Sequence, residues 1–358
     1  SPIPRQEAES CMDRLLEQYP DVKKVLLIPP DFTRCYSYAG ELTQILYKKL
    51  APRVLVHIMP ALGTHMAMDE EEKQKMFGSE IPPEAFLDHH WQTDTVSIGI
   101  VPREVIEKIS QGLYSTEIEV EVNERLINGE YDLILSIGQV VPHEVVGMAN
   151  YSKNIFVGTG GRQMINKSHM LSAICGMEKA LGVADSPARK VFDYAQKHFV
   201  DGKLPLVYIQ TVTTLEKQNV ALHGLYIGAS RTPFEMAAAL SEQLNICHVE
   251  RRAKKLVTYL DPYELKTTWV GNKGIYRTRM AVADGGELIV QGGIVHPVRP
   301  AALGAVGAAG AAAQAQQQAG QRQRKDFFHR RSPPSSRQRA KRTSKQVPSG
   351  FRRRAVTV

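Results

Sequence analysis

Short runs of large apolar residues alternate along the chain with stretches in which apolar residues recur at helical spacing. Runs of about four to eight residues rich in Val, Ile and Leu are typical of strands buried on both faces. They occur at 22–29, 53–60, 94–102 and 131–138, and helical spacing is found between them at 41–50 and 103–114. This alternation predicts an α/β domain with a largely parallel sheet.

A second series of elements follows two further helical stretches at 169–182 and 190–199. Strands are predicted at 205–213, 219–228, 254–260 and 286–293, with helices at 233–244 and about 263–281. We therefore expect two α/β domains with mainly parallel sheets, residues 1–200 and residues 201–298, and an active-site cleft between them.

The last part of the chain has a different composition. Residues 301–358 contain thirteen Lys/Arg and one acidic residue, whereas residues 1–300 contain 32 basic and 36 acidic residues, a net charge of −4. The net charge of +8 thus arises in this tail, and the rest of the chain gives no reason to expect a nucleic-acid partner. Because it has few large apolar residues, we predict a disordered, low-complexity basic tail at 299–358.

Features that would direct the chain to a membrane or an oxidising compartment are lacking in the sequence. No apolar run reaches the roughly 18 residues of a membrane span, and SPIPRQEAES does not resemble a signal peptide. The four cysteines are widely spaced and form no CxxC. We expect a cytoplasmic protein with reduced thiols and no membrane partner.

Polar residues follow three of the predicted strands. Asp31 and Arg34 come after the first strand in DFTR, His65 after the second in GTH, and His143 after the fourth in PH. A single histidine is more often structural, and an Asp–Arg pair in a loop is by default a local ion pair or helix cap. In parallel sheets, however, ligands bind beyond the carboxyl ends of the strands, so the joint placement favours a binding site.

The segment NYSKNIFVGTGGRQMINKSH, residues 150–169, contains further candidates. Gly160 and Gly161 either let backbone amides approach an anion such as a phosphate or form a tight turn. GTGGRQ has Gln163 where a dinucleotide-binding motif needs glycine, so a nicotinamide-dependent dehydrogenase is only weakly indicated. His65, His143 and His169 also leave open a zinc-dependent hydrolase, although no HExxH motif is present.

Taken together, these motifs resemble those of the nickel-dependent lactate racemase family. The family has an Asp-x-x-Arg after the first strand, a Gly-Thr-His and a Pro-His, matched here by DFTR, GTH and PH. A lysine ten residues beyond the Pro-His histidine and a histidine sixteen further on match Lys153 and His169. The resemblance extends over roughly residues 20–290.

The resemblance implies an isomerase that racemises or epimerises a 2-hydroxy acid. The α-hydrogen would move reversibly as hydride to a nickel-pincer nucleotide, a pyridinium-3,5-bisthiocarboxylic acid mononucleotide nickel complex, through a 2-keto intermediate. Residues 1–200 would form the cofactor-binding domain, and enzymes of cofactor biosynthesis would be partners.

Individual residues take implied roles from the same resemblance. His65 and His143 would be the acid/base pair and His169 the protein ligand to nickel. The list of binding residues comprises Arg34, Lys273 and Trp269 for the substrate, and Asp31, Lys153, Gly160 and Gly161 for the cofactor.

Departures from the family pattern leave three points open. Glycines precede the lysine in the type member but follow Lys153 here, so covalent and non-covalent cofactor binding both remain open. Val270 replaces an expected polar residue three positions before Lys273, which favours a substrate larger than lactate, such as a sugar acid. The altered sequence after residue 300 leaves a catalytically inactive binding relative as the alternative.

Overall fold

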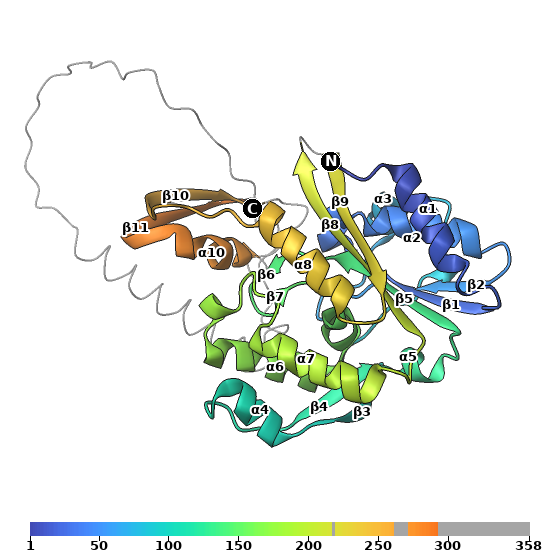
Figure 1. Cartoon of the computed structure of the whole chain (residues 1–358), viewed down its shortest axis with the longest axis horizontal. Helices are drawn as coiled ribbons and strands as arrows, with labels where there is room; N and C mark the ends of the chain where they lie inside the picture. Colours follow the sequence, from blue (N-terminus) through green and yellow to red (C-terminus); the bar gives the residue numbers. More distant parts are fainter. Residues whose placement is uncertain (217–218, 261–270, 293–358) are drawn as a thin grey trace, which may run out of the picture. The chain divides into compact units, whose positions relative to one another are not determined.

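The computed structural model describes residues 1–216, 219–260 and 271–292 (Figure 1). Contacts divide the chain between Pro297 and Val298, and every element described below belongs to the unit before this division. The tail predicted at 299–358 lies outside the described residues.

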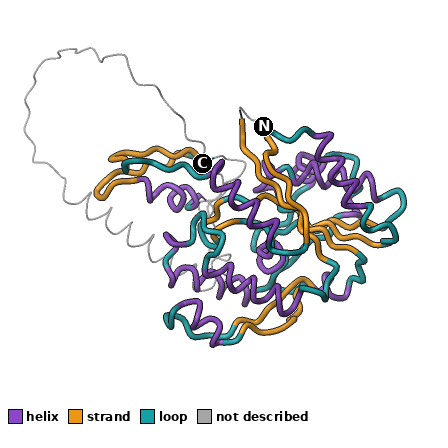
Figure 2. Tube along the Cα trace, in the orientation of Figure 1, coloured by secondary structure: helices purple, strands orange, loops and turns teal. Residues whose placement is uncertain are grey.

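A five-stranded sheet in the order β2-β1-β5-β8-β9 forms the centre of this unit (Figure 2). The first four strands in that order run parallel, and β9 is antiparallel to β8. The structure thus confirms an α/β fold with a mainly parallel central sheet. Its strands are β1 (Lys24–Ile28), β2 (Leu55–Ile58), β5 (Leu133–Gln139), β8 (Leu206–Glu216) and β9 (Asn219–Gly228).

The strands predicted at 205–213 and 219–228 correct one part of the sequence-based picture. They were assigned to a second sheet, but β8 pairs with β5 and β9 pairs with β8, so both extend the first sheet. Residues Leu206 to Thr213 are all buried, as expected of a strand with neighbours on both sides. An apolar run indicates that a strand is buried and does not say which strand it pairs with.

Helices cover both faces of the sheet. Val207 and Ile209 of β8 join the apolar core formed with α1 (Arg5–Leu16) and α2 (Ala39–Leu50). Tyr208 points to the opposite face and contacts Tyr151, which stacks on Phe234 of α8 (Thr232–Asn245). This alternation follows the two-residue period of a strand, and Figure 1 shows α8 crossing β8 and β9.

The strand predicted at 94–102 does not join the parallel sheet. It forms β3 (Thr95–Val101), which pairs in antiparallel fashion with β4 (Ile118–Asn123), a strand that the sequence analysis missed. Both are only partly buried, and the sequence IEVEVN alternates apolar and polar residues as a two-faced strand does. Strict alternation in this sequence was therefore the signal for β4.

The remaining elements connect or flank these layers. The parallel pair β10–β11 forms a separate two-stranded sheet, and the helix predicted at 263–281 is observed only as α10 because residues 261–270 lie outside the described residues. The further bounds are α3 (Glu70–Phe77), α4 (Arg103–Ser110), α5 (Glu124–Asn128), β6 (Pro142–His143), β7 (Gly147–Met148), α6 (Arg162–Cys175), α7 (Pro187–Ala195), β10 (Ala253–Tyr259), α10 (Lys273–Thr278) and β11 (Val282–Gln291).

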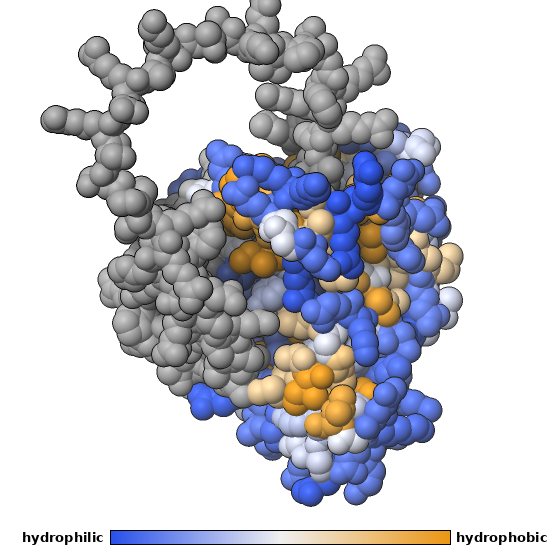
Figure 3. Space-filling view, turned by 90° about the vertical axis from the view of Figure 1, so that its left-hand side faces the viewer, coloured by the Kyte–Doolittle hydropathy of each residue, from blue (hydrophilic) through white to orange (hydrophobic). Residues whose placement is uncertain are grey.

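The surface is mixed in polarity. On the face seen in Figure 3, hydrophilic residues surround several small hydrophobic patches. Among the described residues, no helix combines the length and apolar character needed to cross a membrane.

Candidate active site

The His65 imidazole lies against the Asp31 carboxylate beyond the ends of β1 and β2. Nδ1 of His65 is 2.5 Å from Oδ2 of Asp31, and the Thr33 hydroxyl donates to Oδ1 at 2.6 Å. Burial raises the pKa of this carboxyl group, but His65, Thr33 and Arg34 together lower it below its usual value. An ionised carboxylate only accepts hydrogen bonds, so Nδ1 of His65 carries a proton. When the ring holds this one proton, Nε2 has the free lone pair.

Arg34 follows in the short 3₁₀ segment Phe32–Ser37, where its own backbone departs from helical geometry. Its positive charge acts on Asp31, His143 and Lys153. With other described residues its guanidinium makes no hydrogen bond or ion pair. The planar fork is thus available for an anionic ligand such as a carboxylate.

The GTH loop is attached to the lysine-containing segment. Gly63 has φ +57°, which favours glycine, and its amide donates to the Gly158 carbonyl at 2.8 Å. A Cβ atom on Gly158 would lie 2.6 Å from the Ala61 side chain, so the two backbone segments approach more closely than a residue larger than glycine at position 158 would allow. Backbone contacts therefore bring His65 and the segment after Lys153 together.

An unusual turn leads into Lys153. Asn150 and Tyr151 both have positive φ, 63° and 54°, a conformation that costs non-glycine residues about 1 kcal/mol or more each. The side-chain amide of Asn150 donates to the Gly138 carbonyl at 2.7 Å, and this hydrogen bond fixes one side of the turn. Directly after Lys153, residues Asn154–Gly158 form a π-helical segment, a feature often found at functional sites.

A buried arginine holds the other side of this turn. The guanidinium of Arg189, on α7, donates to the carbonyls of Met148 and Asn150 at 2.6 and 3.2 Å and to the Ser152 hydroxyl at 2.9 Å. It also lies 4.5 Å from the centre of the Phe234 ring, a cation–π contact. Arg189 thus fixes the backbone conformation immediately before Lys153, a role that the sequence analysis did not identify.

The partly buried Lys153 amine lies among other cations. Burial lowers its pKa most, the charges of Arg34 and Lys273 lower it further, and Asp31 and Glu144 oppose them, giving a pKa of about 7. A large share of the amine is therefore uncharged at neutral pH. An uncharged lysine amine is a nucleophile.

His143 is almost fully buried after β5, beside Glu144. Its Nδ1 atom accepts hydrogen bonds from the backbone amides of Val145 and Val146, at 3.2 and 3.4 Å. Burial lowers the pKa of His143 well below its usual value, and the charge of Glu144 opposes this shift. A backbone N–H only donates, so this ring is neutral with its proton on Nε2.

The orientation of the His169 ring is fixed by a hydrogen bond within α6. Its Nδ1 lies 2.6 Å from the Ile165 carbonyl one turn earlier on α6, so Nδ1 donates and Nε2 has a free lone pair. Burial has the largest effect on the pKa of His169 and lowers it, and the charge of Lys153 lowers it further. A neutral imidazole with its second nitrogen fixed by a carbonyl is the form that binds metals.

The glycine cluster before α6 is tightly packed. A Cβ atom on Gly160 would lie 2.0 Å from the Phe156 carbonyl oxygen, and one on Gly161 would lie 2.6 Å from the Glu121 side chain. The Glu121 carboxylate already accepts from the Gln163 amide in the first turn of α6, at 2.6 Å. These contacts explain both glycines by packing, and their cofactor role stays a prediction.

Two further predictions concern the second half of the chain and the histidines. Lys273, at the start of α10, is close enough for its charge to act on His143 and Lys153, whereas Trp269 lies outside the described residues. No group of three or more His, Cys, Asp or Glu side chains suited to a metal ion occurs in the described part of the chain. The three-histidine zinc site considered from the sequence is therefore not formed.

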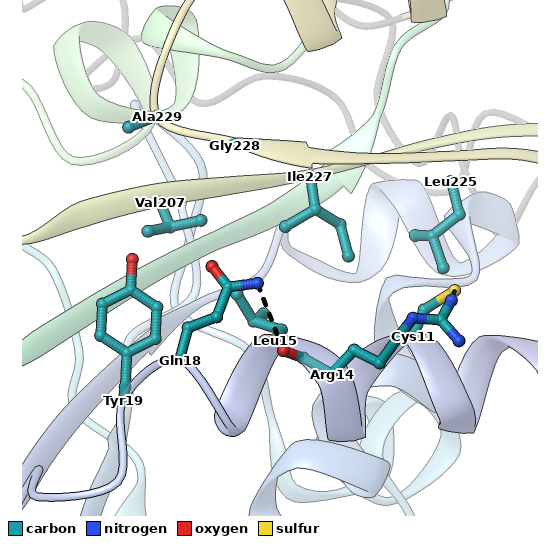
Figure 4. A pocket seen from close by; sticks show the side chains of 10 residues that line it. All are labelled: Cys11, Arg14, Leu15, Gln18, Tyr19, Val207, Leu225, Ile227, Gly228 and Ala229. Carbon is teal, nitrogen blue, oxygen red and sulfur yellow. Dashed lines mark hydrogen bonds between the residues drawn. The ribbon is translucent and has the colours of Figure 1, made fainter.

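A cavity of about 360 Å³ between α1 and the β8–β9 strands is separate from these residues (Figure 4). Cys11, Arg14 and Gln18 line it on the α1 side, and Val207 and Ile227 line it on the sheet side. Arg14 donates to the Cys11 sulfur at 3.0 Å, and Gln18 to the Arg14 carbonyl at 3.3 Å. None of the predicted site residues lines it.

Comparison with known proteins connects this geometry to a family. Residues 9–182 match the profile of the lactate racemase N-terminal domain. This range contains the predicted site residues that follow β1, β2 and β5, together with Lys153 and His169. Residues 9–182 therefore form a domain related to the N-terminal domain of lactate racemase.

Solved structures agree with this relationship. A protein from Thermotoga maritima is 27% identical, with a TM-score of 0.73, over 80% of this chain and 70% of that one. The lactate racemase apoprotein from Thermoanaerobacterium thermosaccharolyticum is 20% identical, with a TM-score of 0.59, over 79% of this chain and 66% of that one. The second likeness concerns the fold. A comparison with curated protein sequences gave no match.

The lowered pKa of Lys153 leads to a direct prediction. Its reaction rate with a small acylating reagent should rise with pH and reach half of its maximum near pH 7, whereas an ordinary lysine does so at about 10.4. Competitive labelling with acetic anhydride from pH 5 to 10, read by mass spectrometry, measures this. The exposed Lys108 is the internal reference, and a midpoint near 10 for Lys153 would contradict the prediction.

Proposed function

We propose that this chain is an isomerase that racemises or epimerises a 2-hydroxy acid with a nickel-pincer nucleotide. The observation that supports it most is the grouping of two imidazoles, His65 and His143, around the Arg34 guanidinium and the Lys153 amine. Inversion at a hydroxyl-bearing carbon needs an acid/base group on each side of the substrate, and histidine suits this task near neutral pH.

The residues present fit the proposed cofactor. Lys153 offers an amine with a pKa of about 7, suited to covalent attachment, and His169 offers a neutral Nε2 for nickel. One protein ligand suffices if the nucleotide supplies the others, which agrees with the lack of a three-residue metal cluster in the described residues. When bound, the group would supply the hydride acceptor for the α-hydrogen.

The protein side chains handle the proton and the substrate. Nε2 of His65 takes the hydroxyl proton, and the Asp31 carboxylate at Nδ1 stabilises the imidazolium that results. Arg34 binds and orients the substrate carboxylate through paired hydrogen bonds, with the Lys273 charge nearby. His143 returns a proton to the substrate oxygen on the other side. Asp31 and His143 are buried, which strengthens the electrostatic interactions that these two residues make.

Nickel content of the purified protein tests the proposal. After co-expression with enzymes that make the cofactor, the wild-type chain should contain stoichiometric nickel, and His169→Ala should lose most of it, because a metal ligand is removed. His90→Ala is the matched control, since His90 lies at the surface beside Asp94. Unchanged nickel in His169→Ala would overturn the assignment.

Activity of the loaded protein separates an enzyme from an inactive relative. With a panel of 2-hydroxy acids in deuterium oxide, the proposed mechanism gives inversion while the α-hydrogen is retained, because it moves as hydride. Absence of inversion with every substrate would favour the binding relative. Washout of the α-hydrogen would instead indicate proton abstraction from carbon.

A further inference from the structure

Glu144 is a buried anion that none of the predicted roles uses. It is only 7% exposed, and its Oε2 atom has no hydrogen-bond partner among the described residues. Burial raises the pKa of this carboxyl group, but His143, Lys273 and Arg277 outweigh burial and hold the pKa well below its usual range. A buried ionised oxygen without a partner costs about 1–3 kcal/mol or more, so this arrangement calls for a functional reason.

The His143 ring is a titratable group close to this oxygen. Oε2 of Glu144 is 3.9 Å from Nδ1 of His143, too far for a hydrogen bond. In the structure Nδ1 accepts from the Val145 and Val146 amides, so the ring proton is on Nε2. In this tautomer Nε2 has no free lone pair, and a neutral N–H is a poor acid. His143 therefore needs a second state to act as acid or base.

Resting on the proposed acid/base role of His143, we propose that Glu144 is the charge partner that makes this second state possible. When the ring gains a proton, Nδ1–H donates to Oε2 of Glu144 in place of accepting from the backbone. The imidazolium then gives its Nε2 proton to the substrate oxygen, which leaves a neutral ring with the proton on Nδ1. In the reverse direction that ring takes the substrate hydroxyl proton at Nε2. In each turnover one histidine takes a proton from the substrate oxygen and the other gives one to it, and exchange with solvent water restores the starting protonation of both rings.

The charges around His143 show why such a partner is needed. The positive charges of Lys153, Lys273 and Arg34 act on the ring and disfavour an imidazolium, whereas the negative charge of Glu144 favours it. Shortening the 3.9 Å separation to about 2.8 Å requires a movement of about 1 Å, within the range of small side-chain rotations.

His65 and Asp31 already form the corresponding pair at 2.5 Å. Two histidine–carboxylate pairs would thus serve the two faces of the substrate. Glu144 would be a positioning residue, because it acts through His143 and not on the substrate.

Histidine-ring ¹⁵N NMR of the full chain without cofactor tests this pairing independently of catalysis. The His143 signal is assigned by its loss in His143→Gln. Glu144→Gln should lower the pKa of His143 by about one unit or more, because it removes the opposing charge about 4 Å away. The wild-type ring should gain an Nδ1 proton on acidification. Glu9→Gln, at a surface pair with Arg5, should leave His143 unchanged.

Two results would overturn the pairing. One is a His143 titration in Glu144→Gln that coincides with that of the wild type. The other is a wild-type ring that keeps its proton on Nε2 alone down to pH 4. If Glu144→Gln does not fold, Glu144→Asp keeps the charge but retracts it by one methylene group, and it should lower the pKa by a smaller, measurable amount.

Kinetics of the loaded protein separate this inference from the proposed function. Glu144→Gln should shift the acidic limb of the pH profile and lower kcat/KM in both directions by the same factor, as the fixed equilibrium constant requires. Racemisation with an unshifted His143 contradicts the pairing alone. An NMR shift in a loaded protein that does not racemise contradicts the proposed function and supports the pairing.

Discussion

Substitution of Asp31 by asparagine is expected to lower kcat for the proposed racemisation about 1,000- to 10,000-fold. The Asp31 carboxylate accepts from Nδ1 of His65, which leaves Nε2 free to take the substrate proton. An asparagine amide can donate to Nδ1, and the ring proton then moves to Nε2, where it blocks the base. The nickel-loaded variant should still bind substrate, so the loss should fall on kcat more than on KM.

A matched substitution distinguishes this tautomer effect from a general effect of removing an aspartate. Asp69 caps α3 through a hydrogen bond from the Glu72 amide, and asparagine caps helices equally well. Asp69→Asn should therefore keep wild-type kcat and stability. A loss of less than tenfold in Asp31→Asn would show that His65 is not oriented by this carboxylate. It would also move the base role to another residue.

The sequence predicted the elements whose signal is local. Apolar runs predicted β1, β2 and β5. The polar residues directly after these strands lie at one edge of the sheet, because parallel strands end at the same edge. Pairing is not local. The run at 205–213 has the same composition whether its strand extends the first sheet or begins a second one, so its assignment to a second sheet was wrong.

The candidate site shows the same limit at the level of single side chains. Glu144 follows the histidine of the PH motif within an apolar run, and an unpaired acidic residue in such a run was the available signal for it. Arg189 gave no such signal, because one arginine on an amphipathic helix is normally at the surface. Its buried position depends on the positive-φ turn at Asn150 and Tyr151, which is a tertiary feature.

Replacement of Arg189 by methionine should destabilise the protein by about 2–4 kcal/mol. Methionine fills a similar volume, but the carbonyls of Met148 and Asn150 and the Ser152 hydroxyl lose their donor. Burial lowers the pKa of Arg189 to about 10, so the cation itself is costly to bury, and this relief offsets part of the loss. Urea unfolding should show a lower midpoint with an unchanged slope.

The same variant tests whether Arg189 also fixes the position of Lys153 and thereby its reactivity at neutral pH. If Arg189 fixes the turn before Lys153, the variant should lose the neutral-pH labelling of Lys153 under conditions in which it remains folded. Arg103→Met, at an exposed position on α4, should change stability by no more than about 0.5 kcal/mol and leave labelling unchanged. A destabilised Arg189→Met that labels Lys153 as the wild type does would limit the arginine to a packing role. The strained turn would then be held by the hydrogen bond from the Asn150 side-chain amide to the Gly138 carbonyl and by the stacking of Tyr151 on Phe234.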